Sequence, residues 1–314
     1  MLTDPITFQP IFMERPWGGR RLETSFHFSL PPEKKIGELW SIVDRAEAQS
    51  IVVEGLLAGK TLHELWQEHR EKVFGTIHLK NPSQRFPLLC KLLDATEKLS
   101  LQVHPPEAVA KELGGEPKTE CWYILEADPG ATIDAGLRRG ITRETFEQAL
   151  HKGKVSSTLH QIPVHTGESI LLPSGRLHAL GKGIMIAEIQ QNSDTTYRVF
   201  DWNRKGFDGK PRELHLAESM ASINFEDYEP SIQPNDVPTI ADCSYFKIEK
   251  WQLNKPCFAN TENSFCLITC LTGCIRCGTK TFSPGQFFLV PASMQDPILI
   301  PEAPATTLLK IQNK

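Results

Sequence analysis

The sequence predicts a mainly β protein, either a barrel or a sandwich of short strands, and three observations support this prediction. Many short apolar segments are bounded by turn residues, 23 prolines and 21 glycines are spread along the chain, and helical patterns are few. Prolines and glycines at this frequency separate short segments and disfavour long helices. With 314 residues, the chain is long enough for one large domain or two.

The expected strands either alternate between apolar and polar residues or form short apolar runs between turn residues. The segment 37–43 alternates and ends in charge, whereas the later segments are more continuously apolar. We expect strands over residues 37–43, 87–93, 99–104, 121–126, 169–173, 184–191 and 245–253.

Four short helices are expected among these strands. Thr61 and Glu64 have the spacing of a capping box, in which each side chain satisfies a free backbone N–H at the helix start. Apolar residues follow at helical spacing as far as Val73. Further helices are expected over 107–113, after Thr142 as N-cap, and over 213–219, and no solenoid repeat is present.

The segment 229–238 has three prolines and no periodicity, which indicates a linker. It divides the chain into two expected domains. Residues 1–235 would form the catalytic domain with the helical insert, and residues 240–314 a second, smaller β-barrel with a turn at Pro284 and Gly285. No histidine follows His215, so the smaller barrel is expected to lack a histidine-based metal site and to serve for packing.

Composition excludes several classes of protein. The chain has 34 basic and 38 acidic residues, a net charge of −4, which gives no sign of nucleic-acid binding. No apolar run approaches the roughly 20 residues that span a bilayer, and the N-terminal segment lacks a signal-peptide pattern. Eight cysteines are too sparse for a disulfide scaffold. We therefore expect a cytoplasmic protein without membrane or nucleic-acid partners.

Four residues form a candidate metal site. Gln102 and His104 are two positions apart at the end of a strand, so they point to the same face before Pro105 ends the strand. Glu120 opens another strand, and His178 follows a tight turn. Two histidines and a carboxylate with an open position are typical of a catalytic site for zinc or a similar ion. The amide oxygen of Gln102 is a rarer fourth ligand.

Each of these residues also has a simpler interpretation. A single histidine near a strand end is usually a hydrogen-bonded polar residue, and a buried glutamate is more often paired with a cation than bound to a metal. The metal hypothesis therefore rests on the combination and its spacing.

Several motifs in order resemble the type I mannose-6-phosphate isomerases, and two of them match the short bacterial branch of that family. The PSGRLHA segment at 173–179 also resembles the second motif of cupins in general. The matches are LSLQVHP at 99–105, KTECWY at 118–123, PSGRLHA at 173–179 and EIQQNSDTTYR at 188–198, with RPWGG at 15–19 and GELWS at 37–41 for the short branch.

This resemblance implies a cupin (jelly-roll) barrel and one zinc ion per chain. Carried over residue by residue, the family's ligands fall on Gln102, His104, Glu120 and His178. The implied reaction interconverts mannose 6-phosphate and fructose 6-phosphate by moving a proton between C1 and C2 through a cis-enediol(ate). The implied partner is a small hexose 6-phosphate, and the protein is expected to be a monomer or a small homo-oligomer.

Such a reaction needs a base, a Lewis acid and cations that hold the phosphate. The resemblance gives Arg198 a role in stabilising the enediolate or binding phosphate, and Glu188 a role as acid/base or as an orienting group. Lys91 and Lys118 match family lysines, and Ser100 matches a position suited to bonding the phosphate. Three groups are candidates for the base that abstracts the proton: a metal-bound water, Glu188 and a lysine. Structural ion pairs inside the barrel are the alternative for the charged residues.

Two other groups of residues have competing interpretations. An Asp201–Arg204 pair is as consistent with fixing a loop as with touching substrate. Cys266, Cys270, Cys274 and Cys277 lack the paired spacing of a zinc ribbon, and alternation places Cys266 and Cys270 on one apolar face.

Two rival functions remain. A cupin metalloenzyme of another class, such as an iron-dependent dioxygenase, is disfavoured by Gln102 and the two lysines. A non-catalytic sugar-phosphate sensor is disfavoured because every ligand and Arg198 are present. Nucleotide-binding motifs and the Gly-x-Ser-x-Gly motif are absent from the sequence.

Overall fold

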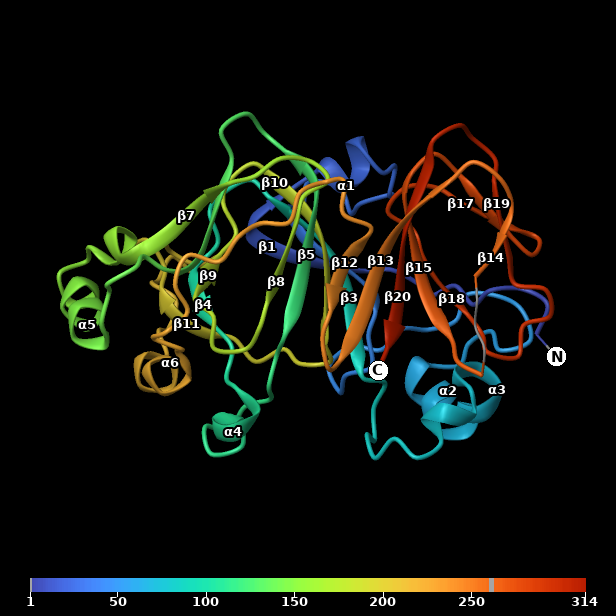
Figure 1. Cartoon of the computed structure of the whole chain (residues 1–314), viewed down its shortest axis with the longest axis horizontal. Coiled ribbons are helices and arrows are strands. Elements are labelled where there is room, and N and C mark those ends of the chain that lie inside the picture. Colours follow the sequence, from blue (N-terminus) through green and yellow to red (C-terminus); the bar gives the residue numbers. More distant parts are fainter. Residues whose placement is uncertain (1, 260–262) are drawn as a thin grey trace.

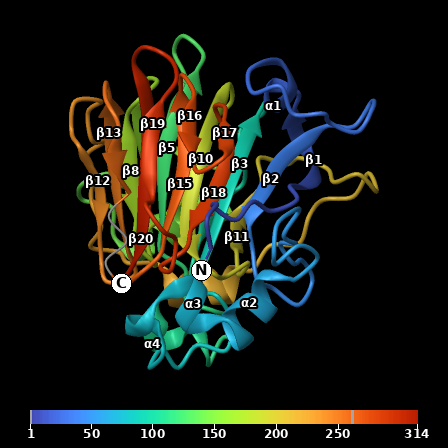
Figure 2. The same ribbon diagram turned by 90° about the vertical axis from the view of Figure 1, so that its right-hand side faces the viewer.

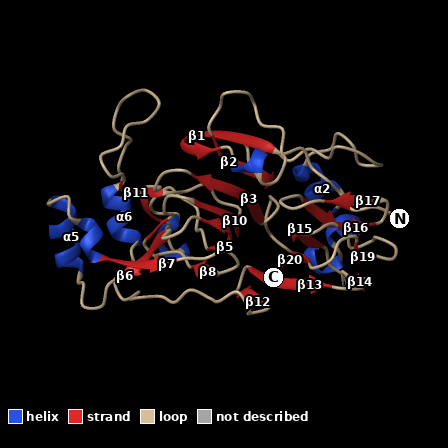
Figure 3. Ribbon diagram, turned by 90° about the horizontal axis from the view of Figure 1, so that it is seen from above, coloured by secondary structure: helices blue, strands red, loops and turns tan. Residues whose placement is uncertain are grey.

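Four antiparallel sheets, stacked in layers, make up the part of the chain that the computed structural model describes, residues 2–259 and 263–314 (Figures 1 and 3). The predicted mainly β class with few helices is confirmed, and the antiparallel sheets are consistent with the predicted cupin barrel. The six-stranded sheet comprises β1 (Ile11–Gly19), β2 (Ile36–Ile42), β3 (Leu88–Ala95), β10 (Ile184–Gln191), β5 (Glu120–Ala127) and β8 (Ser169–Leu172), in that order. Its partner sheet comprises β11 (Tyr197–Phe200), β4 (Leu101–Val103), β9 (His178–Ala179), β6 (Thr132–Leu137) and β7 (Leu159–Pro163).

The six-stranded sheet is buried on both faces. On β3 and β10, Leu92 and Ala187 belong to an apolar cluster shared with the C-terminal strands, whereas Leu93 and Ile186 belong to a cluster shared with β6 and β7. Successive side chains of a strand point to opposite faces, so burial on both sides makes these strands continuously apolar. We call the face toward β6 and β7 the inner face, and the space between these two sheets the interior of the first barrel. A polar side chain on the inner face therefore points into this interior.

The C-terminal strands form the other two sheets, and Figure 2 shows them in front of the six-stranded sheet. The five-stranded sheet comprises β12 (Thr239–Asp242), β13 (Phe246–Leu253), β20 (Thr306–Asn313), β15 (Cys266–Thr272) and β18 (Phe287–Val290). The four-stranded sheet comprises β14 (Cys257–Phe258), β19 (Ile298–Pro301), β16 (Ile275–Cys277) and β17 (Lys280–Phe282).

Cysteines pack in the core between these two sheets. As predicted, Cys266, Ile268 and Cys270 lie in one apolar cluster, which also contains Cys277. Burial raises the pKa of each of the three thiols to about 12. The thiols are therefore neutral and pack as small apolar groups.

The helices are short and lie outside the sheets. They are α1 (Arg21–Thr24), α2 (Leu62–Glu68), α3 (Arg70–Phe74), α4 (Glu107–Ala110), α5 (Arg143–His151) and α6 (Leu216–Ser222), with 3₁₀ turns η1 (Thr76–His78) and η2 (Val155–Thr158). The predicted capping box at Thr61 and the N-cap at Thr142 are confirmed. In the described residues, no helix is both long and apolar enough to cross a bilayer.

Three helix boundaries differ from expectation. The helix after Thr61 breaks at His69, and a separate α3 places Phe74 against Phe265 of the C-terminal part, with ring centroids 5.2 Å apart. The helix over 107–113 ends as a helix at Ala110 because turns lead into two glycines. The last helix starts at Leu216 instead of residue 213, because the backbone N–H of His215 bonds the carbonyl of Arg198 on β11 (2.9 Å).

The two barrels contact each other extensively. One apolar cluster joins the outer face of the six-stranded sheet to β13, β15 and β20, and the N-terminal segment bridges to the C-terminal part through Ile6 and Leu289. We propose the division into domains 1–235 and 240–314 on the basis of the linker, with this apolar layer as their interface.

Candidate metal centre and its cavity

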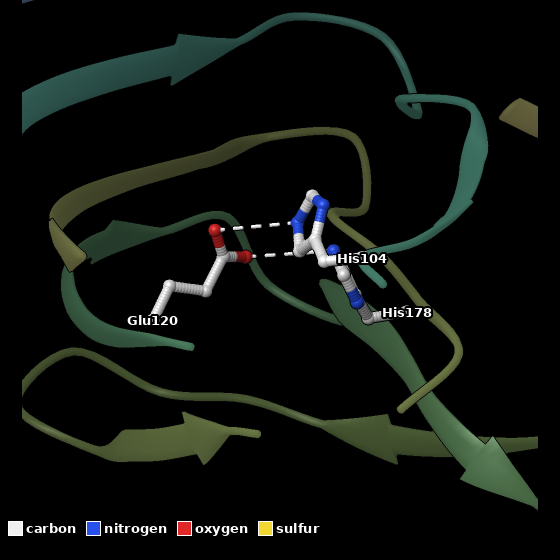
Figure 4. Close-up of side chains that lie close together, drawn as sticks. All are labelled: His104, Glu120 and His178. Carbon is white, nitrogen blue, oxygen red and sulfur yellow. Dashed lines mark ion pairs between the residues drawn. The ribbon is translucent and has the colours of Figure 1, made fainter. Parts of the chain in front are cut away.

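His104, Glu120 and His178 converge inside the first barrel (Figure 4). Their candidate ligand atoms lie within 4.8 Å of one another, and all three residues are buried. Glu120 begins β5 and His178 begins β9, while His104 directly follows β4. The turn before His178 is held by a bond from the N–H of Gly175 to the carbonyl of His104 (2.8 Å), and Gly175 has a φ of 89° that favours glycine.

The two imidazoles present the same nitrogen to the carboxylate. Nε2 of His104 is 3.5 Å from Oε2 of Glu120, and Nε2 of His178 is 3.4 Å from Oε1. Each Nδ1 donates to a backbone carbonyl at 2.9 Å, that of Thr195 or that of Arg176. A carbonyl only accepts, so each Nδ1 carries the proton of a neutral ring, and each Nε2 has a free lone pair.

Electrostatics keeps both rings neutral. Burial, followed by the charge of Lys118, lowers the pKa of His104 to about 3. Burial also lowers the pKa of His178. The pKa of Glu120 is held well below its usual range: burial opposes this, but the nearby cation of Lys118 outweighs it. The centre therefore consists of a carboxylate and two imidazole lone pairs at neutral pH.

This donor set fits a divalent metal ion. Nε2 of His104 and Nε2 of His178 are buried and have no hydrogen-bond partner among the described residues. Electron-rich atoms that face one another without a proton between them are unfavourable unless a cation lies between them. Two imidazole nitrogens and a carboxylate oxygen suit zinc and related ions.

Gln102 lies beside this group but makes a different contact. It is the register partner of His178 on β9 and of Arg198 on β11. Its Nε2 donates to Oγ of Ser100 at 3.1 Å, which fixes the amide, and its oxygen makes no hydrogen bond to a described residue. That oxygen is therefore available as a further ligand.

A cavity of about 400 Å³ adjoins the centre. Of the site residues predicted from the sequence, His104 alone is absent from its wall; those that line it are Lys91, Ser100, Gln102, Lys118, Glu120, His178, Glu188 and Arg198. Four further charged residues line the same wall and were not predicted as site residues: Arg15, Glu38, Asp194 and Arg212. Arg15 and Glu38 belong to the two motifs of the short bacterial branch, and Asp194 lies in the motif at 188–198, so these motifs could have pointed to them. Arg212 lies in no motif, so the sequence offered no sign of its position.

Opposite charges alternate along the inner face of the six-stranded sheet. Nζ of Lys118 lies 2.8 Å from Oε2 of Glu120 and 3.9 Å from Oε1 of Glu188, and Nζ of Lys91 lies 3.3 Å from the same Oε1. Oε2 of Glu188 accepts a bond from Nε1 of Trp122 at 2.9 Å. The ion pairs considered in the sequence analysis thus exist, and they line the cavity.

Glu188 is the carboxylate in this row whose pKa is raised. Burial is the main cause, and the neighbouring Glu120 adds to it, although both lysines oppose it. The pKa of Lys118 is raised, because Glu120 and Glu188 outweigh the opposing effect of burial. Lys118 therefore remains a cation, whereas Glu188 is shifted toward neutral pH, as a proton-transfer group requires.

Glu38 on β2 is the last carboxylate in this row of charges. Its Oε1 accepts a bond from Nε of Arg15 at 2.8 Å, its Oε2 accepts one from Nε1 of Trp40 at 2.6 Å, and Nζ of Lys91 lies 4.0 Å from Oε2. Burial would raise the pKa of Glu38, but Lys91 and Arg15 lower it to about 2. Glu38 is therefore ionised and helps to hold Lys91.

Comparison with known proteins relates this chain to one family. The model of the type I phosphomannose isomerase catalytic domain matches residues 6–130. Mannose-6-phosphate isomerase ManA of Bacillus subtilis is 38% identical over 282 residues, which is 87% of each chain. Mannose-6-phosphate isomerase of Streptococcus mutans is 38% identical over 279 residues, covering 87% of this chain and 86% of its own.

Solved structures agree with the sequence relatives. The crystal structure of mannose 6-phosphate isomerase from Bacillus subtilis superimposes with a TM-score of 0.87 at 34% identity, covering 99% of this chain and 100% of its own. A mutant of phosphomannose isomerase from Salmonella typhimurium has a TM-score of 0.75 at 14% identity, covering 99% of this chain and 100% of its own, and shares the fold. This chain belongs to the type I phosphomannose isomerase family.

Proposed function

We propose that this protein is a metal-dependent isomerase that interconverts mannose 6-phosphate and fructose 6-phosphate. The observation that carries the proposal is the buried group of His104, Glu120 and His178, whose two free imidazole lone pairs adjoin a cavity lined by lysines and arginines. The relatives from Bacillus subtilis and Streptococcus mutans are named mannose-6-phosphate isomerases, which supports the proposal.

The metal in this proposal is one zinc ion per chain. His104, Glu120 and His178 would hold it, with the amide oxygen of Gln102 as a fourth ligand. When bound, the ion supplies a Lewis acid beside the carbonyl and hydroxyl oxygens of the sugar. The bonds from each Nδ1 to a backbone carbonyl support the role, because they fix the ring orientation that a ligand needs.

Glu188 is the group that moves the proton in this proposal. Its carboxylate takes the proton from C2 of the aldose, the C2–H electron pair forms the C1–C2 double bond of a cis-enediol(ate), and the C1 carbonyl pair moves to O1. A proton passes from O2 to O1, and Glu188 returns its proton to C1 as the C2 carbonyl forms. The raised pKa of Glu188 and its fixed position between Lys91 and Trp122 support this assignment. Delivery of this proton to C1 regenerates the carboxylate, so atoms and charge balance.

Cations that line the cavity hold the substrate. Lys118 and Lys91 supply positive charge to sugar oxygens on which negative charge develops. Ser100 and Arg198 face the phosphate: the Ser100 hydroxyl accepts a bond from Gln102 and donates none to a described residue, and the buried Nε of Arg198 has no partner among the described residues. Arginine suits phosphate because of its planar fork.

Turnover with and without metal tests this function. Purified protein is assayed for conversion of mannose 6-phosphate before chelation, after chelation and after zinc is added back. His104→Ala is compared with His165→Ala, a matched control at an exposed histidine that does not line the cavity. We expect activity to disappear on chelation, to return with zinc, to be absent in His104→Ala and to persist in His165→Ala. A folded, fully metallated protein without turnover would overturn the proposal and favour a sugar-phosphate sensor or another cupin chemistry.

The same proposal places the protein in the cytoplasm as a monomer or small homo-oligomer. Eight free cysteines support a reducing compartment.

A further inference from the structure

A second arginine lines the cavity near Arg198. Arg198 lies on β11, where it is the register partner of the candidate ligand Gln102. Arg212 lies in the loop between β11 and α6 and lines the same cavity. Arg212 lies outside the family motifs and was not predicted as a site residue.

A buried carboxylate fixes the plane of this second guanidinium. Arg212 donates from Nε to Oδ2 of Asp201 at 2.7 Å and from Nη2 to Oδ1 at 2.6 Å. Asp201 is 5% exposed, so the pair is largely shielded from water. Such two-point pairing specifies orientation as well as position. It uses Nε and Nη2, and Nη1 of Arg212 donates to no described residue.

Asp201 is itself anchored by a third arginine that plays a different part. Arg204 donates from Nη2 to Oδ1 of Asp201 at 2.6 Å and from Nη1 to the carbonyl of Lys98 at 2.6 Å. It does not line the cavity. Arg204 therefore ties the carboxylate to the segment before β4, whereas Arg212 extends from the carboxylate to the cavity.

Arg198 and Arg212 bring two guanidinium groups to the cavity wall, and among the described carboxylates Asp201 alone forms an ion pair with either of them. One carboxylate, Asp201, faces the guanidinium groups of both Arg204 and Arg212. Arg198 donates from Nη1 to the carbonyl of Glu213 at 2.6 Å, but its buried Nε has no partner among the described residues. Burial, and then the charge of Arg212, lower the pKa of Arg198, so the two guanidinium groups repel each other. An anion between them would remove this repulsion.

We propose that Arg212 binds the phosphate of the hexose 6-phosphate together with Arg198, and that Asp201 is the positioning residue that orients Arg212. This inference rests on the proposed function and adds the group that selects phosphorylated sugars. A phosphate dianion offers several acceptor oxygens, and Nη1 of Arg212 and Nε of Arg198 are unused donors that suit it.

Binding of inorganic phosphate is the first test, because it needs no turnover. Affinity is measured by calorimetry for the whole protein and for Arg212→Gln, with Arg139→Gln as the control at an arginine that is 75% exposed and does not line the cavity. Loss of a charged hydrogen bond predicts a roughly ten- to hundredfold weaker affinity in Arg212→Gln. We expect Arg139→Gln to keep the affinity of the unaltered protein. Equal affinity in Arg212→Gln, or equal weakening in both variants, would overturn the proposal.

Two further variants keep the test valid if Arg212→Gln folds poorly. Arg212→Lys retains a charge but not the planar fork, and Asp201→Asn retains the shape but not the charge that orients Arg212. Both should bind phosphate with intermediate affinity, and unchanged affinity in both would contradict the proposal. In the isomerase assay, KM for mannose 6-phosphate should rise in Arg212→Gln more than kcat falls, a split that a merely structural loop residue would not produce.

These outcomes separate the inference from the proposed function. If the metallated protein does not turn over mannose 6-phosphate but binds phosphate through Arg212, the isomerase proposal fails and the phosphate subsite stands. If turnover is normal and KM and phosphate affinity are unchanged in Arg212→Gln, the subsite fails and the isomerase proposal stands.

Discussion

Nζ of Lys91 lies 3.3 Å from Oε1 of Glu188, and the two residues face each other as register partners on β3 and β10. Each side chain is 5% exposed, so both charges are buried. The sheet register therefore holds the carboxylate of Glu188, the proposed proton-transfer group, against the ammonium group of Lys91. Both residues line the cavity. A buried pair of this kind is sensitive to loss of either partner, because the remaining charge has no water to solvate it.

The first prediction concerns the coupling of this pair. Lys91→Met should lower the free energy of unfolding by roughly 2–4 kcal/mol, because it leaves Glu188 and Glu38 without their shared cation. Glu188→Gln should lower it less, because the raised pKa of Glu188 means that burial already disfavours the ionised carboxylate. The double variant should be less destabilised than the sum of the two, with a coupling of about 1–3 kcal/mol. Urea unfolding of the four proteins measures this cycle. Strictly additive losses would show that the two charges do not stabilise each other.

The second prediction concerns turnover in Glu188→Gln. Loss of a positioned proton-transfer group should lower kcat by about 10²- to 10⁴-fold, with little change in KM. The amide can still accept the bond from Nε1 of Trp122, so the side chain is expected to stay in place. Metal content, measured on the same sample, should remain at one ion per chain. Wild-type kcat in a fully metallated variant would remove Glu188 from the proton transfer.

The third prediction concerns the pH dependence of stability at Glu38. Its folded pKa of about 2 lies below the value of 4.5 for a free glutamate side chain. A lowered folded pKa means that the stabilisation is fully present above pH 4.5 and is lost as the pH falls toward 2. At pH 7, Glu38→Gln should therefore be less stable by roughly 3 kcal/mol.

The measurement for Glu38 is urea unfolding over a pH series. The difference between Glu38→Gln and the unaltered protein should narrow as the pH is lowered below 4.5. Glu14→Gln, at a carboxylate whose side chain is 40% exposed, provides a control that should change stability little at any pH. A difference that does not change with pH would mean that packing, rather than charge, explains the effect.

The fourth prediction concerns metal binding and its effect on stability. Free zinc at 100 times its dissociation constant should stabilise the chelated protein by about 2.7 kcal/mol and raise its melting temperature by several degrees. His104→Ala should lose this increase. Cys266→Ala should keep one ion per chain, because its thiol is buried in the C-terminal core. Elemental analysis and calorimetry check both variants, and loss of the ion from Cys266→Ala would assign the metal to the cysteines.

Local patterns in the sequence were sufficient for several features. The capping box at Thr61 and the N-cap at Thr142 depend on residues three positions apart, so the sequence predicted both correctly. Cys266 and Cys270 share a face because strand alternation has a period of two. The spacing of Gln102 and His104 before Pro105 likewise predicted side chains on the same face.

The tertiary structure decided what distant segments do together. The break at His69 follows from packing of Phe74 against Phe265, which no local pattern contains. Arg212 carried no motif, and its candidate role appears only because Asp201 directs it toward the cavity.

The sequence by itself therefore determined the mainly β class, the helix starts and the residue types of the candidate metal centre. The tertiary structure alone decided that Lys91 faces Glu188, that each Nε2 of His104 and His178 points at Glu120, and which further charges line the cavity. The physical reason is the separation along the chain over which each kind of interaction acts. Helix caps and strand alternation act over a few residues, whereas contacts across a sheet are set by strand register and by the packing of one layer on the next.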